Sequence, residues 1–166
     1  MAKAPSVLRE IADRRATDIA AELGTSTFDD LSPKAVKGPR RREVTGRFAR
    51  PGLHLIAEIK RSSPSAGKLA PRRLDVAQRA RAYQAGGASM ISVLVEPHWF
   101  GGSLKDLQAA RAATTLPVLA KEFVVDARQL PLLRAAGADA VLLLAALHPN
   151  ARLAKLVQVA QGARRR

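Results

Sequence analysis

Four short apolar runs, each followed by an amphipathic segment, are the feature that most constrains how this chain can fold. The runs lie at Leu53–Ile59, Ser89–Glu96, Pro117–Phe123 and Asp139–Leu147. Near-continuous apolar runs are typical of strands that are buried on both faces, and amphipathic segments between them are typical of helices that cover a sheet. The alternation therefore predicts an α/β protein with a parallel sheet.

The amphipathic segments predict four helices after these strands. They lie at Leu74–Gly87, Ser103–Thr114, Asp126–Gly137 and Asn150–Gly162. Two helix-to-strand turns, "AGGAS" and "AAGAD", are alike, which indicates equivalent strand–helix units. A flavodoxin-like open sheet and a (β/α)8 barrel both fit this alternation.

The residues before the first strand have a different character. Val7–Leu23 carries apolar residues at helical intervals and ends at Gly24, which predicts a helix. Residues 25–52 are rich in turn formers and predict a connecting segment with at most one short helix. We therefore expect a helical extension and linker over residues 1–52, followed by four strand–helix units over residues 53–166.

Composition excludes several classes of protein. The chain has 166 residues, 47% of them hydrophobic, which suits a globular core. It has no cysteine and three scattered histidines, so the sequence predicts neither a disulfide framework nor a metal site. It also lacks a signal peptide's apolar segment and any apolar run that could span a bilayer. We expect a cytoplasmic protein without a membrane partner.

The formal net charge of +14 raises the question of an anionic partner. Much of this charge lies in basic runs at residues 37–50, 68–81 and 163–166. Aromatic residues are few and do not alternate with these runs, so a stacking platform for single-stranded nucleic acid is unsupported. The basic runs favour a solvated surface over a nucleic-acid site.

Ionisable residues stand at the carboxyl ends of three predicted strands. Glu58 and Lys60 share one face of the first strand, Glu96 closes the second, and Lys121 closes the third. Such groups are expensive to bury without partners, and in a (β/α)8 barrel these strand ends surround the active site. The alternative interpretation is that Glu58–Lys60 and Glu96–Lys121 are merely ion pairs that plug the top of the barrel, but three successive strands favour a site.

The sequence around these residues closely resembles the indole-3-glycerol phosphate synthase family. The resemblance covers essentially the whole chain, from Val7 to about Gln161. Its blocks agree in order and spacing, and they read "IAEIKRSSPSAGKL" (56–69), "ISVLVEPHWFGGSLKDL" (91–107), "LPVLAKEFVVDARQL" (116–130) and "AAGADAVLLL" (135–144). The Glu-x-Lys-x-x-Ser-Pro-Ser pattern, with Lys121 downstream, argues against phosphoribosylanthranilate isomerase and the tryptophan synthase alpha chain, two related phosphate-binding barrels.

The resemblance implies a TIM barrel that closes and decarboxylates 1-(2-carboxyphenylamino)-1-deoxyribulose 5-phosphate in tryptophan biosynthesis, without cofactor or metal. It makes Lys121 the general acid, which protonates the sugar carbonyl or the departing hydroxyl. It makes Lys60 the contact for the substrate carboxylate, and Glu58 part of the network that orients both lysines. The substrate-binding residues it implies are Ser63, Pro64, Ser65, Glu96, Phe100 and Phe123.

The sequence departs from the family pattern in two ways. Val95, Ala120 and Glu122 replace residues that are usual beside the site, but their strand parity directs them toward the helices, so we expect mild effects. The family barrel has eight units and this chain has four, so we expect the first half of a barrel with negligible turnover alone. Its expected partner is a complementary half-barrel or a second copy. The alternative is a non-catalytic remnant, a half-barrel interaction module with a basic surface.

Overall fold

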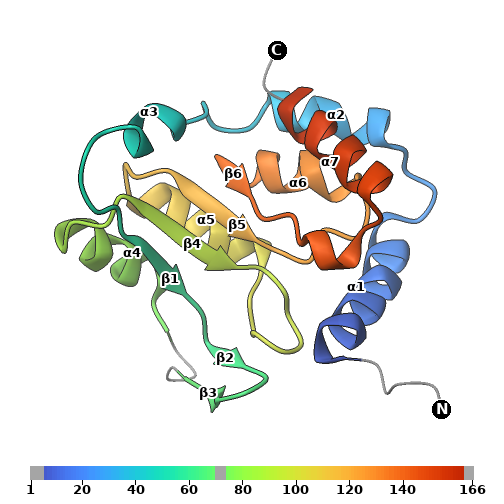
Figure 1. The fold of residues 1–166 in the computed structure, drawn as a ribbon, viewed down its shortest axis with the longest axis horizontal. Coiled ribbons are helices and arrows are strands. Elements are labelled where there is room, and N and C mark those ends of the chain that lie inside the picture. The colour runs from blue at the N-terminus through green and yellow to red at the C-terminus, as the bar shows by residue number, and fades with distance from the viewer. Residues whose placement is uncertain (1–5, 70–73, 163–166) are drawn as a thin grey trace.

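A computed structural model of the chain describes residues 6–69 and 74–162 (Figure 1). The terminal basic run at 163–166 and part of the run at 68–81 therefore lie outside the described residues. Within the described ranges, no helix is long and apolar enough to cross a membrane.

A parallel sheet of four strands forms the centre of the fold. The strands are β1 (Ile56–Ile59), β4 (Met90–Leu94), β5 (Val118–Lys121) and β6 (Ala140–Val141), in the order β1-β4-β5-β6. This confirms the predicted strands and their parallel direction. The fourth strand is much shorter than predicted, because the chain leaves the sheet after Val141 and forms a short 3-10 helix at Ala145–Leu147. Among the described residues β6 has a strand neighbour on one side only, so few ladder hydrogen bonds hold it.

Helices follow the strands as predicted. They are α4 (Val76–Ala85), α5 (Leu104–Ala113), α6 (Gln129–Ala135) and α7 (Asn150–Gly162). The side chains of Asp75 and Ser103 accept hydrogen bonds from the backbone of the first turns of α4 and α5, which explains where these helices begin. In Figure 1, α4 and α5 lie behind the sheet. An apolar core fills the space between these helices and the sheet.

The residues before β1 contain three helices, α1 (Val7–Leu23), α2 (Phe28–Val36) and α3 (Thr45–Phe48). The first confirms the predicted helix, and the other two exceed the single short helix expected in the linker. A capping box at the start of α2 accounts for part of this difference, because Thr27 and Asp30 satisfy each other's backbone N–H groups. Helix α1 lies beyond the carboxyl ends of the strands, whereas α2 packs on α6 (Figure 1).

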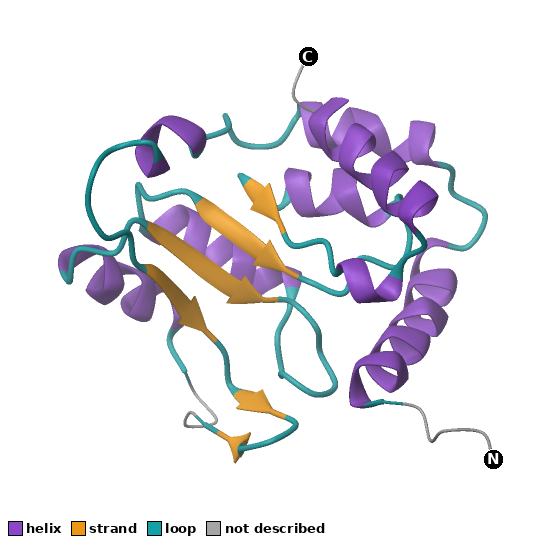
Figure 2. Cartoon of the chain, viewed as in Figure 1, coloured by secondary structure: helices purple, strands orange, loops and turns teal. Residues whose placement is uncertain are grey.

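The loop after β1 forms a small antiparallel hairpin, which the sequence did not predict. Its strands are β2 (Ser62–Ser63) and β3 (Gly67–Lys68). The hairpin projects from the carboxyl end of the sheet (Figure 2) and carries the Ser-Pro-Ser motif. The sheet therefore presents β1, the hairpin and the loops after β4 and β5 at one rim.

Candidate functional site

Two lysines and one glutamate meet at the carboxyl ends of β1 and β5. Glu58 Oε1 lies 3.1 Å from Lys60 Nζ, and Glu58 Oε2 accepts a hydrogen bond of 2.5 Å from Lys121 Nζ. Strand parity explains this meeting. Glu58 pairs in register with Ser92 of β4, and Lys121 pairs with Leu94 two residues further along that strand, so both side chains rise from the same face. The structure thus brings together Glu58, Lys60 and Lys121, while their catalytic roles stay predictions.

The electrostatics of this cluster favour an ionised carboxylate. Burial opposes charge on Glu58, but the hydrogen bonds and positive charges of Lys121 and Lys60 outweigh burial and lower the pKa of the Glu58 carboxyl. The two lysine side chains are more than a third exposed, whereas that of Glu58 is 25% exposed. The cluster therefore carries a net positive charge and has two ammonium groups accessible to an anionic ligand.

Glu96 lies apart from this cluster and organises its own loop. Its side chain is fully buried, and its carboxylate accepts hydrogen bonds from the backbone N–H groups of His98, Trp99 and Phe100 at 2.8 to 3.0 Å. Of the two ion pairs in the alternative interpretation, Glu58–Lys60 is therefore present, whereas Glu96–Lys121 is wrong because Lys121 pairs with Glu58 instead. Glu96 shapes the loop that carries Phe100, and a direct contact with substrate stays a prediction.

Phe100 and Phe123, from the loops after β4 and β5, pack against each other. Their ring centroids are 6.2 Å apart with an interplanar angle of 32°. They belong to an apolar cluster that also contains Trp99 and the α1 residues Ile11 and Ala12. The two rings that the sequence predicted as walls of the site therefore lie together, and α1 supports them.

The predicted Ser63–Ser65 segment forms the exposed tip of the β2–β3 hairpin. Ser63 Oγ accepts a hydrogen bond from the backbone of Ala66, and Pro64 and Ser65 are exposed. The residues just before this segment hold the hairpin in place. Ser62 Oγ donates to the Trp99 carbonyl at 2.8 Å, and Arg61 forms an ion pair with Asp106 of α5.

A buried ion pair that the sequence did not predict links α1 to β5. Arg15 Nε and Nη2 donate to Glu122 Oε2 at 3.2 and 3.0 Å, and both side chains are at least 93% buried. A sequence signal existed, since Arg15 stands between Ile11 and Ile19 at intervals of four residues and thus interrupts the apolar stripe of the helix. Its partner lies 107 residues away, so no local pattern could reveal the pair itself.

Burial dominates the electrostatics of Glu122. It raises the pKa of the Glu122 carboxyl, and the charge of Arg15 offsets this effect only in part, while the nearby Glu96 carboxylate raises the pKa further.

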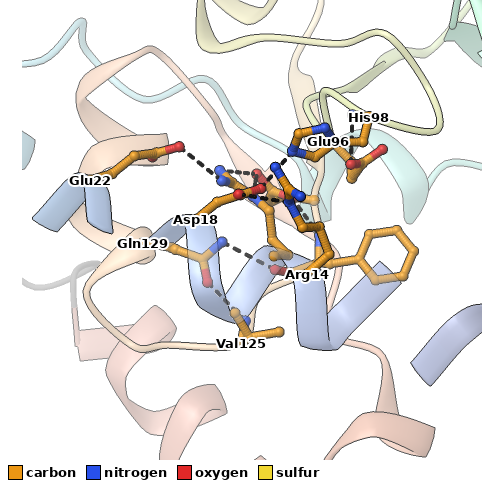
Figure 3. Close-up of polar contacts among 10 residues, drawn as sticks. Arg14, Asp18, Glu22, Glu96, His98, Val125 and Gln129 are labelled. Carbon is orange, nitrogen blue, oxygen red and sulfur yellow. Dashed lines mark hydrogen bonds and ion pairs between the residues drawn. The ribbon is translucent and has the colours of Figure 1, made fainter. Parts of the chain in front are cut away.

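Figure 3 shows further polar contacts around α1, in which His98 Nε2 lies 2.8 Å from Asp18 Oδ2 and Gln129 binds the backbone after β5. Helix α1 is thus attached to the loops after both β4 and β5.

A cavity of about 260 Å³ lies near the amino end of β6, and Arg41, Arg42, Arg134 and Asp139 are among its lining residues. The lysine cluster, by contrast, lies on the face of the sheet that α4 and α5 do not cover. In the part of the chain that the structure describes, no three histidine, aspartate or glutamate side chains are placed to hold a metal ion.

Comparison with known proteins gives one consistent family. A family model described as indole-3-glycerol phosphate synthase matches residues 8–164. Proteins of that name are 42% identical over 156 residues in Streptomyces griseus and 45% identical over 141 residues in Mycobacterium ulcerans. These alignments cover 94% and 85% of this chain but 58% and 52% of the relatives. A third, from Mycobacterium avium, is 44% identical over 152 residues, which is 91% of this chain and 56% of the relative. The chain therefore spans about half the length of the curated relatives it matches.

Proposed function

The chain belongs to the indole-3-glycerol phosphate synthase family, and from this membership we propose that it supplies the proton-donating and carboxylate-binding part of a synthase active site. The family is a TIM-barrel family, and the four-stranded parallel sheet is consistent with a partial barrel. The single observation that supports the proposal most is the Glu58 carboxylate that bridges Lys60 and Lys121.

The proposed substrate is 1-(2-carboxyphenylamino)-1-deoxyribulose 5-phosphate, and the reaction closes the indole ring with loss of carbon dioxide and water. Lys60 binds the aryl carboxylate, because an exposed ammonium group is a compact partner for a carboxylate. Phe100 and Phe123 form an apolar wall beside the aromatic ring. Lys121 then donates a proton to the sugar carbonyl oxygen as the ring carbon attacks the carbonyl carbon.

Glu58 has two tasks in this proposal. Its carboxylate orients Lys121 toward the reacting atoms while it balances part of the charge of the two lysines. In the later steps carbon dioxide leaves and its electron pair restores the aromatic ring. The hydroxyl then departs as water with a proton from Lys121, which has regained one from solvent, and Glu58 accepts the proton that the adjacent methylene carbon loses. The Ser63–Ser65 tip and Glu96 complete the proposed substrate-binding set.

The test is a turnover assay on this substrate, with the chain alone and with an added C-terminal half of the Streptomyces griseus relative. We expect negligible turnover alone and measurable turnover in the mixture. In the mixture, Lys121→Ala should lower kcat by roughly 100-fold to 10,000-fold, the usual contribution of a general acid. Lys34→Ala, on α2 away from the rim, is the matched control and should leave kcat unchanged. Full activity of the Lys121→Ala mixture would contradict the acid role.

The proposed macromolecular partner is a complementary half-barrel, with a second copy of this chain as the alternative. Exposed apolar side chains at the start of β1 support an interacting surface, since Leu53 is fully exposed and Leu55 is 56% exposed. A non-catalytic interaction module would use the same surface without turnover.

A cytoplasmic location belongs to the proposal and rests on family membership. If the basic surface instead binds nucleic acid, a mobility shift should persist at physiological salt, which we do not expect.

A further inference from the structure

The buried ion pair between α1 and β5 is attached to the backbone that carries two site residues. Glu122 stands directly between Lys121 and Phe123 in the sequence. Its Oε2 accepts both hydrogen bonds from Arg15, while its Oε1 accepts a hydrogen bond of 2.8 Å from the backbone N–H of Phe123. Both carboxylate oxygens are therefore used, and together they fix the backbone at the end of β5 to α1.

This attachment has a consequence for Lys121, the last residue of β5, which Glu122 follows directly. Because the Glu122 carboxylate is held to α1, it restrains the backbone from which the Lys121 side chain extends to the Glu58 carboxylate. A rotation of the backbone at Glu122 would move Lys121 and Phe123 together.

The apolar contacts of α1 determine the position from which the Arg15 side chain extends. Ile11 and Ala12 pack in one cluster with Phe123, Trp99 and Phe100. Arg15 follows Ile11 by one helical turn and is 6% exposed, so its guanidinium approaches Glu122 from a helix that the core already holds. Arg15 Nη1 also donates to Glu22 at 3.1 Å, which restricts the orientation of the guanidinium plane.

We propose that Arg15, acting through Glu122, is a positioning residue that sets the orientation of Lys121 and Phe123 at the rim. The consequence of this positioning for catalysis rests on the proposed function, whereas the orientation of Lys121 can be measured without turnover. A buried ion pair contributes little net stability compared with apolar residues of the same size. Its directional hydrogen bonds, by contrast, fix one backbone orientation, which an apolar pair does not do.

The first test observes Lys121 directly by NMR in a chain with ¹³C-labelled lysine. The ε-carbon signal of Lys121 is assigned as the one missing from Lys121→Arg. We expect this signal to shift in Arg15→Met and in Glu122→Gln, because each variant releases the backbone beside Lys121. The signal of Lys34 on α2 should not move in either variant. The matched control is Arg14→Met, the neighbouring arginine, which forms an exposed ion pair with Asp18 and should leave Lys121 unchanged.

Arg15→Lys keeps the charge of the pair but loses the second hydrogen bond to Glu122. It should fold even if Arg15→Met does not, and it should shift the Lys121 signal by a smaller amount. If Arg15→Lys and Glu122→Gln fold and the Lys121 signal stays where it is in the parent chain, the positioning role is overturned. An equal shift in Arg14→Met would also overturn it, since the effect would then be a general loosening of α1.

The second test measures binding of anthranilate, an aromatic carboxylate, through the fluorescence of Trp99, the single tryptophan of the chain. We expect Arg15→Met to raise the Kd by about tenfold, because Phe123 and Lys121 move together. An unchanged Kd in a folded Arg15→Met variant would contradict the inference. Failure of the parent chain to bind anthranilate would contradict the proposed function instead, and the NMR signal would still decide the positioning role.

Discussion

Glu58 accepts contacts from two lysines, and its own protonation decides whether both contacts persist. Its pKa is lowered from the ordinary value of 4.5 because the two lysines outweigh burial. For a carboxyl whose pKa is lower in the folded state, the stabilisation is present above the unfolded pKa and is lost as the pH falls through the folded pKa. Acidification through the folded pKa of Glu58 should therefore weaken the lysine cluster.

Glu58→Gln tests this linkage. At neutral pH we expect the variant to lose less than about 1 kcal/mol of unfolding free energy, because both lysines are substantially exposed and screened by water. Urea unfolding should show a constant difference from the parent chain between about pH 7 and pH 5.5, which then shrinks below about pH 4.5. High salt should reduce the difference at neutral pH. A difference that grows on acidification would contradict the assignment.

The charged cluster could be predicted from sequence, but the contacts of Glu96 could not. The period of two along a strand places Glu58 and Lys60 on one side, and this holds without knowledge of the rest of the fold. Glu96 shares the expected parity, yet its carboxylate turns to three backbone N–H groups of its own loop. Such loop geometry depends on local turns that strand parity does not describe.

The loop after β4 depends on close approach of its backbone to the strand. Gly102 donates a backbone hydrogen bond to Glu96, and a Cβ atom placed on Gly102 would overlap the backbone of Leu94 and Val95. Because backbone atoms cannot move aside as a flexible side chain can, the loop must shift if Gly102 acquires a side chain. Phe100 would shift with it.

Gly102→Ala should therefore lower the unfolding free energy by roughly 1–3 kcal/mol, the usual effect of overpacking a dense site. It should also change the emission of Trp99, which lies in the same loop. Gly46→Ala is the matched control, since a Cβ on that helical glycine would lie 3.7 Å from its nearest neighbours. The control should be neutral or slightly stabilising. Equal urea midpoints for Gly102→Ala and the parent would disprove the overlap.

At the level of elements, amphipathic helices were predicted well and strand lengths less well. Helices α4 to α7 follow from apolar periodicity, and the starts of α4 and α5 follow also from capping residues; both are local properties. The brevity of β6 depends on how many neighbours the strand has, which is a property of the sheet and not of the segment. The attachment of α1 through Arg15 is likewise long-range and needed the fold to be found.

At the scale of the whole molecule, the four-stranded sheet has two unpaired strand edges among the described residues. β1 and β6 each have one strand neighbour, and the apolar side chains of Leu53, Leu55 and Ile56 are 45% or more exposed next to the β1 edge. Unpaired edges beside apolar side chains favour association with another chain. The net charge of +14 acts against association of identical copies, so salt should strengthen it by screening.

Sedimentation equilibrium should accordingly show an average mass that rises with concentration, and more steeply in high salt. Leu53→Lys combined with Leu55→Lys should weaken this self-association by at least about tenfold, since it places two charges on the apolar edge. Val36→Lys, which adds a charge to an equally exposed position on α2, is the control and should have little effect. If both variants weaken association to the same degree, net charge rather than the β1 edge governs it. If the parent chain stays monomeric at all concentrations and salt levels, the exposed edge is not an interaction surface for a second copy, and a complementary half-barrel is then the remaining partner for β1 and β6.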